Sequence, residues 1–136
     1  MAKSTSLLSK AVMVEKEVEL PTSTGTVTGP SVGAGTLVLA SGVELIDAMD
    51  STDYDVTVTD GTTTFMAATA VDSGSAGDFA FGTQTQGVIA AADTIDVTGT
   101  ATVAPAATVT ARVWAIVVDV NEATKGADEV DRDLLA

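Results

Sequence analysis

Apolar and polar residues alternate along several stretches of the chain. A period of two is typical of β-strands that bury one face. In residues 11–20, AVMVEKEVEL, one face carries Val12, Val14, Val18 and Leu20. The other face carries Met13 and three glutamates. Lys16 interrupts the apolar face, which a strand at the edge of a sheet tolerates. The pattern therefore predicts a half-buried edge strand.

The clearest alternation lies in residues 54–71, YDVTVTDGTTTFMAATAV. The residues expected to point inward are Tyr54, Val56 and Val58, and those expected to point outward are Asp55, Thr57 and Thr59. Asp60-Gly61 is expected to form a two-residue turn, because glycine supplies a positive φ and aspartate tolerates one. We therefore predict a β-hairpin whose second strand runs from Thr62 to Val71.

The last strong pattern covers residues 108–120, TVTARVWAIVVDV. One face holds Val109, Ala111, Val113, Ala115 and Val117, and the other holds Thr110, Arg112, Trp114, Ile116 and Val118. Both faces become apolar toward the end of the stretch. We expect this end of the strand to be central in its sheet and covered on both sides.

The remaining patterns are shorter. Three stretches predict further strands: 36–40, 79–81 and 88–105, the last with Ile95 and Val97 inward. Residues 43–50 fit either one helical turn or another strand. Residues 21–35 contain two prolines and four glycines, which prevent a helix, so they fit an irregular strand or an extended arm.

Short strands separated by glycine and aspartate turns indicate an all-β fold, either an antiparallel β-sandwich or a jelly-roll-like barrel. The 22 threonines and 19 valines fit the residue preferences of strands. We expect residues 1–10 to form a flexible N-terminal arm and residues 11–120 a single domain. Residues 121–136 are expected to form an acidic tail or a short docking helix.

The composition predicts association with other protein surfaces. Apolar residues make up 46% of the 136 residues, but most are valine and alanine, beside one Trp, one Tyr and three Phe. Small side chains bury little area, and burial contributes only about 25 cal/mol per Å². An isolated monomer would be marginally stable, so we expect the chain to pack against copies of itself or against a larger surface.

The charge argues against several partners. The formal net charge is −13, and residues 17–111 contain twelve acids and neither Lys nor Arg. Such a surface repels phosphate groups, so neither nucleic acid nor an anionic membrane is expected as a partner. The N-terminal residues do not resemble an export signal, and the longest apolar run, 113–118, is far shorter than a membrane span. These features predict synthesis in a cytoplasm without export.

The available functional groups argue against catalysis. The chain has no Cys and no His, which excludes disulfides, thiolate or imidazole metal ligands, and a histidine base. Carboxylate pairs could serve glycoside hydrolysis, but aromatic residues are only 4% of the chain, too few to line a sugar cleft. We therefore expect no enzyme activity and no cofactor.

Four aspartates fall within eleven residues: Asp50, Asp53, Asp55 and Asp60. Their spacing does not match a calcium loop of the EF-hand type. Turn formation and an acidic outer face explain them more simply. Only Asp50 and Asp53 share a loop, so these two remain weak candidates for binding a cation.

Two side chains of the last strand are candidates for an interface. Arg112 is the only basic residue between Lys16 and Lys125, and it is expected to pair with an acid of a neighbouring strand or of a neighbouring subunit. Trp114 is expected to lie in the core or at an interface. Val12 and Val14, in the predicted edge strand, are the other interface candidates.

Taken in order, these segments resemble a known family. They are a Gly/Thr-rich start, the run TLVLASGVELIDAMDSTDYDVTVTDGTTTF, a loop of small residues, AADTIDVTGTATVAPAATVTARVWAIVVDV and an acidic tail. This order resembles the capsid decoration proteins of tailed bacteriophages, also called cement or head-stabilising proteins. The matching parts are a hairpin with an Asp-Gly turn, a DTIDVT strand and a final apolar strand that ends in Val-Asp-Val.

The resemblance implies a β-sandwich or barrel without an active site, found on the capsid surface of the virion. Its expected partners are the major capsid protein and copies of itself, most often as a trimer. It also implies a segment that grips the capsid lattice, either from about Ser4 to Gly35 or from Asn121 onward. Two alternatives remain: another virion part, such as a tail or head-fibre module, and a cation-dependent adhesion or carbohydrate-binding module.

Overall fold

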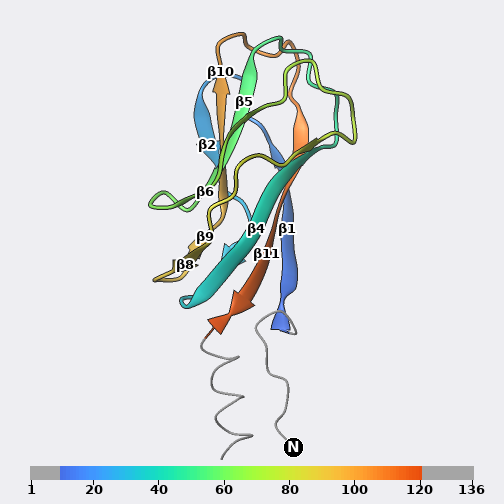
Figure 1. The fold of residues 1–136 in the computed structure, drawn as a ribbon. Helices are drawn as coiled ribbons and strands as arrows, with labels where there is room; N and C mark the ends of the chain where they lie inside the picture. The colour runs from blue at the N-terminus through green and yellow to red at the C-terminus, as the bar shows by residue number, and fades with distance from the viewer. Residues whose placement is uncertain (1–9, 121–136) are drawn as a thin grey trace, which may run out of the picture.

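The computed structural model describes residues 10–120, and every named element within them is a β-strand (Figure 1). The strands are β1 Val12–Glu19, β2 Gly25–Val27, β3 Ser31–Val32, β4 Thr36–Leu45, β5 Tyr54–Thr59, β6 Thr64–Ala70, β7 Phe79–Ala80, β8 Gly87–Ile89, β9 Asp93–Thr94, β10 Asp96–Ala101 and β11 Thr110–Asp119. In this part of the chain no helix has the length and apolarity needed to cross a bilayer. The predicted arm, apart from Lys10, and the predicted acidic tail lie outside the described residues.

The strand pairing is nested. All pairs are antiparallel: β1 with β11, β2 with β10, β3 with β9, β4 with both β8 and β7, and β5 with β6. The first half of the described chain therefore pairs with the second half in reverse order. The chain is folded as one long hairpin, and the turn between β5 and β6 is its tip.

Two further pairings roll this hairpin into two large sheets, while β3 and β9 form a separate two-stranded sheet. β11 also pairs with β4, and β10 also pairs with β5. One sheet then has the order β1-β11-β4-β7, with β8 also on β4, and the other has the order β2-β10-β5-β6 (Figure 1). A long hairpin wrapped into two packed antiparallel sheets is a jelly roll. The predicted fold class is confirmed.

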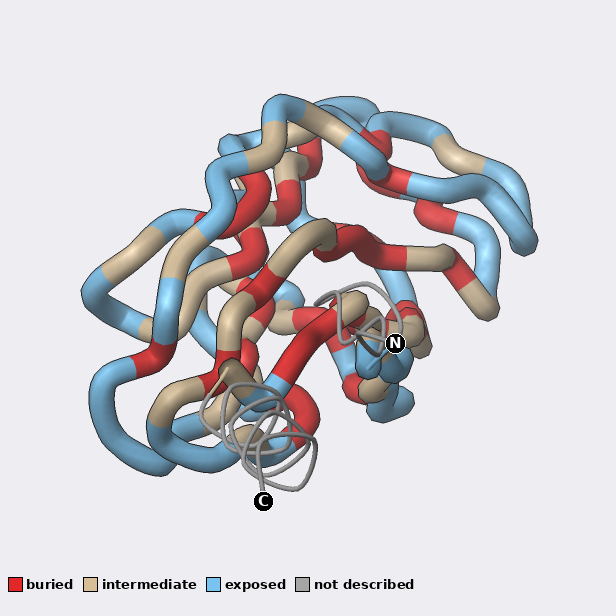
Figure 2. The backbone as a smooth tube through the Cα atoms, turned by 60° about the horizontal axis from the view of Figure 1, so that its bottom comes forward, coloured by how far each residue is buried: buried red, intermediate tan, exposed pale blue. Residues whose placement is uncertain are grey.

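The core lies between the two sheets, because each long strand alternates in burial. In β5, Tyr54, Val56 and Val58 are buried and the residues between them are half-buried, as predicted. Figure 2 shows the buried stretches toward the middle of the molecule, with exposed loops around them. The largest fully buried side chains are Tyr54, Phe65, Leu45, Met49, Met66, Ile89 and Ile95. Most remaining core positions are Val or Ala, as the composition predicted.

Both strands of the larger sheet that the sequence singled out lie where expected. β1 is an edge strand, and β11 is central, between β1 and β4. Val117 and Val118 are neighbours on opposite faces of β11, and both are buried, so this end of the strand is covered on both sides. The edge position of β1 and the central position of β11 are confirmed. The predicted inward face of β1 is buried only toward its end, because Val18 is 8% exposed whereas Val12 is 58% exposed.

The hairpin tip is larger than predicted. β5 ends at Thr59 and β6 begins at Thr64, so four residues connect the strands instead of two. Gly61 has the expected positive φ of 93°. Asp60 acts through its side chain: Oδ1 accepts hydrogen bonds from the amides of Thr62 at 2.8 Å and Thr63 at 2.6 Å. The carboxylate satisfies these two amides, which stabilises the wider turn.

Three shorter predictions need correction. β4 continues from the predicted stretch 36–40 through to Leu45, so residues 43–45 are strand and the helical alternative is wrong for them. Residues 88–105 include parts of three strands, β8, β9 and β10, instead of one. Residues 21–35 contain β2 and β3, which pair with β10 and β9. This segment belongs to the sheets, so it is not an extended arm.

Tyr54, the only tyrosine in the chain, is fully buried between the sheets. Its hydroxyl donates a hydrogen bond of 2.6 Å to the backbone carbonyl of Pro21. The ring passes over Gly99, where a Cβ atom would lie 2.1 Å from the tyrosine hydroxyl. Burial raises the pKa of Tyr54 to about 12, because the phenolate would lose its hydration in the core.

This raised pKa predicts an alkaline loss of stability. An unfolded tyrosine has a pKa of about 10, so above that pH the unfolded chain loses a proton that the folded protein keeps. The contribution is fully present below about pH 10 and is lost as the pH rises through about 12. We expect the free energy of unfolding, measured in urea from pH 9 to 12, to fall less steeply in Tyr54→Phe than in the wild type. Equal slopes in the two proteins would contradict the burial of this phenol.

Candidate functional site

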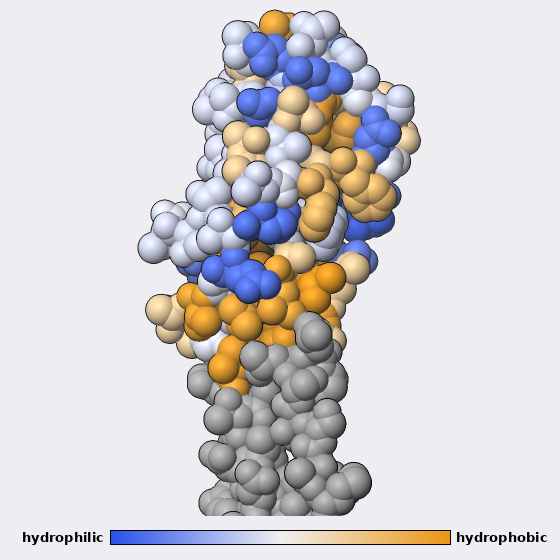
Figure 3. All heavy atoms as spheres, in the orientation of Figure 1, coloured by the Kyte–Doolittle hydropathy of each residue, from blue (hydrophilic) through white to orange (hydrophobic). Residues whose placement is uncertain are grey.

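The outer face of the β1-β11-β4-β7 sheet, turned away from the second sheet, carries the predicted interface residues. The strand register sets three rows across it: Met13–Ile116–Ala40, Glu15–Trp114–Gly42 and Glu17–Arg112–Glu44. The rows change from apolar to charged along the sheet. Figure 3 shows apolar residues gathered where β4 begins, β11 ends and β8 lies.

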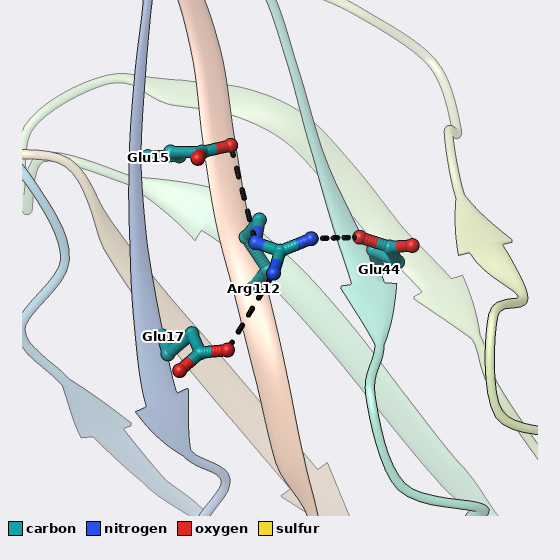
Figure 4. Close-up of polar contacts among 4 residues, drawn as sticks. All are labelled: Glu15, Glu17, Glu44 and Arg112. Carbon is teal, nitrogen blue, oxygen red and sulfur yellow. Dashed lines mark hydrogen bonds and ion pairs between the residues drawn. The ribbon is translucent and has the colours of Figure 1, made fainter.

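Arg112 lies among three glutamates from the two neighbouring strands (Figure 4). Its nearest partner is Glu44 on β4, with 2.7 Å between Nη1 and Oε1. On β1, Glu17 lies 3.5 Å from Nη2 and Glu15 lies 3.9 Å from Nε. The cross-strand pairing expected of Arg112 is therefore present, while its place in an interface stays a prediction. One positive and three negative charges leave this cluster with a formal charge of −2.

Trp114, the only tryptophan, lies flat on the same face and is half-buried. The indole ring rests on Gly42 of β4, where a Cβ atom would come within 2.6 Å of Cζ2. Phe81 stacks on the indole, with ring centroids 5.8 Å apart and planes 10° apart. Nε1 is buried and has no hydrogen-bond acceptor among the described residues. Trp114 therefore lies on the surface of the sheet and not in the core, and its place in an interface stays a prediction.

These side chains enclose a groove of about 290 Å³, which we call the sheet groove. Its lining consists of Met13, Glu15, Glu44, Phe79, Arg112, Trp114 and Ile116. Met13 is 59% exposed and Phe79 is 64% exposed, although both are large and apolar. Of the other two interface candidates, Val12 is 58% exposed and Val14 is half-buried. The lining combines an apolar floor with acidic groups, an arrangement suited to docking another protein.

The two aspartates proposed for a cation have different surroundings. The carboxylate of Asp50 accepts the backbone amide of Ala106 at 3.1 Å. Asp53 instead comes together with Asp55 and Asp72, and one carboxylate oxygen of each lies within 4.8 Å of the others. Sequence reasoning missed Asp72, because it follows β6 and is brought beside β5 only by the return of the hairpin.

This carboxylate cluster gives a testable prediction about calcium. Calcium takes six to eight oxygen ligands, and three carboxylates, two of them on exposed residues, provide a poor set. We expect 1 mM calcium chloride to leave the Tm unchanged in differential scanning calorimetry. A rise that disappears in Asp53→Asn and in Asp72→Asn, but persists in the control Asp93→Asn, would contradict this expectation and favour the cation-dependent alternative.

Comparison with solved structures bears on the fold. A chain of the acidic stable capsid of Helicobacter pylori bacteriophage KHP30 aligns with a TM-score of 0.58 and 13% identity, over 79% of this chain and 86% of that one. The jelly roll of this protein is a fold that occurs in viral capsids. Identity this low shows the fold alone. No model of a protein family matches the sequence, and no curated protein matches it.

Structures of infectious bursal disease virus also align. The Gx strain gives a TM-score of 0.43 at 11% identity, and the Gt strain gives 0.38 at 13%. This chain covers only 33% and 32% of those chains, and TM-scores of this size carry no argument.

Proposed function

We propose that this protein is a structural component of a bacteriophage virion, a capsid decoration protein bound as a trimer to the outer surface of an icosahedral head. The observation that carries the proposal is the nested jelly-roll topology, together with its alignment to most of a phage capsid chain. The order of motifs in the sequence supports the same family. The proposed role is mechanical and involves no catalysis.

The physical basis of such a role is burial of surface between subunits. A stable protein interface buries about 800 Å² on each partner. Free energy gained there must be overcome before neighbouring shell subunits can separate, so the shell is stabilised by mass action. A core built mostly of valine and alanine buries little area per residue, so contacts of this kind would add to the stability of the domain. The sheet groove offers apolar side chains for one of them.

The pairing of the first and last strands constrains where gripping segments begin. Val12, at the start of β1, is the register partner of Val117, near the end of β11. The start of β1 and the end of β11 therefore lie side by side at one end of the domain. Since β1, β2 and β3 belong to the sheets, the arm proposed for residues 4–35 is limited to the residues before β1. We propose that this end of the molecule faces the shell.

Mass and head binding test the proposal together. We expect light scattering to give the mass of a trimer, and purified protein to sediment with phage heads that lack it and to raise the temperature at which they break open. Deletion of residues 1–10 and deletion of residues 121–136 are compared for head occupancy. A monomer that stays in the supernatant would contradict the proposal. Cryo-electron microscopy that places the protein in the tail or a fibre would favour the other virion role.

A further inference from the structure

We infer that the sheet groove binds an extended segment of a partner protein that carries a Lys or Arg beside apolar residues. Under the proposed function this segment belongs to the shell protein, so that attribution rests on the proposed function. The chemistry of the groove itself does not depend on it. Three observations carry the inference: the surplus of negative charge, the exposed apolar lining and the obstruction of the neighbouring strand edge.

The surplus charge is concentrated on one side of the groove. Arg112 lies closest to Glu44, whose side chain is only 23% exposed. Glu15 and Glu17 are farther from the guanidinium, at 3.9 and 3.5 Å, and their side chains are 54% and 60% exposed. Arg112 compensates the negative charge of Glu15 poorly, because the two groups are 3.9 Å apart. A cation from a partner, placed beside Glu15, would balance that charge. Charges that complement each other across an interface favour encounter and fix its register.

The apolar lining of the groove favours a partner segment that carries apolar side chains. Met13 and Phe79 lie beside the half-buried Trp114 and are both more than half exposed. Covering them would contribute about 25 cal/mol for each Å² removed from water. Tryptophan and arginine are also the residues most often found where binding energy concentrates in interfaces. A partner side chain such as Leu next to the cation would fill the groove.

A second copy of this chain is a poorer occupant. Pairing of two β1 edges is opposed by Lys16, which projects from the core-facing side of the strand, as inward charges on edge strands commonly do. Two copies facing each other through their grooves would also bring together two clusters, each with a formal charge of −2. Like charges placed in opposition disfavour such a contact.

The first test uses Trp114 as its own reporter, because the chain has no other tryptophan. The probe is a hexapeptide of alternating Arg and Leu, added to the full-length protein. We expect it to change Trp114 emission saturably, and 1 M salt to weaken the binding about tenfold, since screening shortens the range of charge interactions. A peptide of alternating Glu and Leu should not bind. No change with the basic peptide, or equal binding of both, would overturn the inference.

Matched variants locate the binding. Glu15→Gln is compared with Glu19→Gln, which changes an exposed glutamate of the same strand outside the groove lining. Phe79→Ser is compared with Val103→Ser, an exposed apolar residue outside the lining. We expect each groove variant to weaken peptide binding about fivefold or more and each control less than about twofold. Equal effects of groove and control variants would refute the assignment.

Head binding tests the attribution to the shell separately. The groove variants should lower the occupancy of phage heads while the trimer mass stays unchanged. A lower oligomeric mass in the groove variants, with head binding retained, would make the groove a contact between copies and overturn the inference. If the wild type binds the basic peptide but no heads, the proposed function fails and the chemistry of the groove stands.

Discussion

Replacing Gly29 by alanine is expected to destabilise the domain by about 3 kcal/mol or more. Gly29 is buried between β2 and β3, and a Cβ atom there would lie 1.8 Å from the carbonyl oxygen of Ile95 and 2.9 Å from Cγ1 of Val113. The oxygen belongs to the backbone between β9 and β10, and the amide of Ile95 is bonded to the carbonyl of Pro30 at 2.9 Å. Relief of the clash therefore requires two paired segments to move apart. Urea unfolding measures the loss.

Gly33→Ala is the matched control, four residues along the chain. No atom lies within 4 Å of a Cβ built at Gly33, and its φ is not positive. Alanine there restricts the unfolded chain, so we expect no loss and at most a gain of about 0.4–1 kcal/mol. If the two variants unfold at the same urea concentration, the backbone of Ile95 does not lie as close to Gly29 as the structure shows.

Replacing Phe65 by alanine is expected to cost about 3–5 kcal/mol of unfolding free energy. Phe65 lies on β6, is 1% exposed and belongs to the core between the sheets. The loss has two parts. The variant forgoes the free energy gained when the ring is moved out of water, and it leaves a cavity that the surrounding small residues cannot close. Because the total stability of a domain is about 5–15 kcal/mol, this variant should unfold at a much lower urea concentration.

The chain provides its own comparison, since its other two phenylalanines are exposed. Phe79→Ala, at a position 64% exposed, is expected to change the unfolding free energy by less than about 0.5 kcal/mol. A similar cost for Phe65→Ala and Phe79→Ala would mean that Phe65 does not lie in the core. Phe81 is a weaker control, because its ring also stacks on Trp114.

Long alternating strands were readable from the sequence, and short ones were not. β5 and β11 extend over six and ten residues, enough for a period of two to be visible. β2, β3 and β9 have three residues or fewer, and their sheet membership depends on partners more than sixty residues away. β4 was predicted only in part, because a shift in register opposite Ile116 and Val117 interrupts its alternation.

The candidate site was predictable as single residues but not as an arrangement. The isolation of Arg112 among acids predicted an ion pair, and the structure supplies three. The position of Trp114 depends on Gly42, which becomes its neighbour only once the register of β11 on β4 is known. The same holds for Asp72, which no local pattern connects with Asp53.

The nested pairing has a consequence for the time at which the protein can fold. Val12 and Val117 are register partners separated by 105 positions in the chain, so closing β1 onto β11 forms the largest loop in the described structure. Contacts between such distant residues slow folding, and the hairpin tip between β5 and β6 is the contact that can form early. During synthesis β1 must wait unpaired until β11 has left the ribosome. Its alternating valines and its backbone edge stay uncovered for that time, and such unpaired apolar strands favour aggregation.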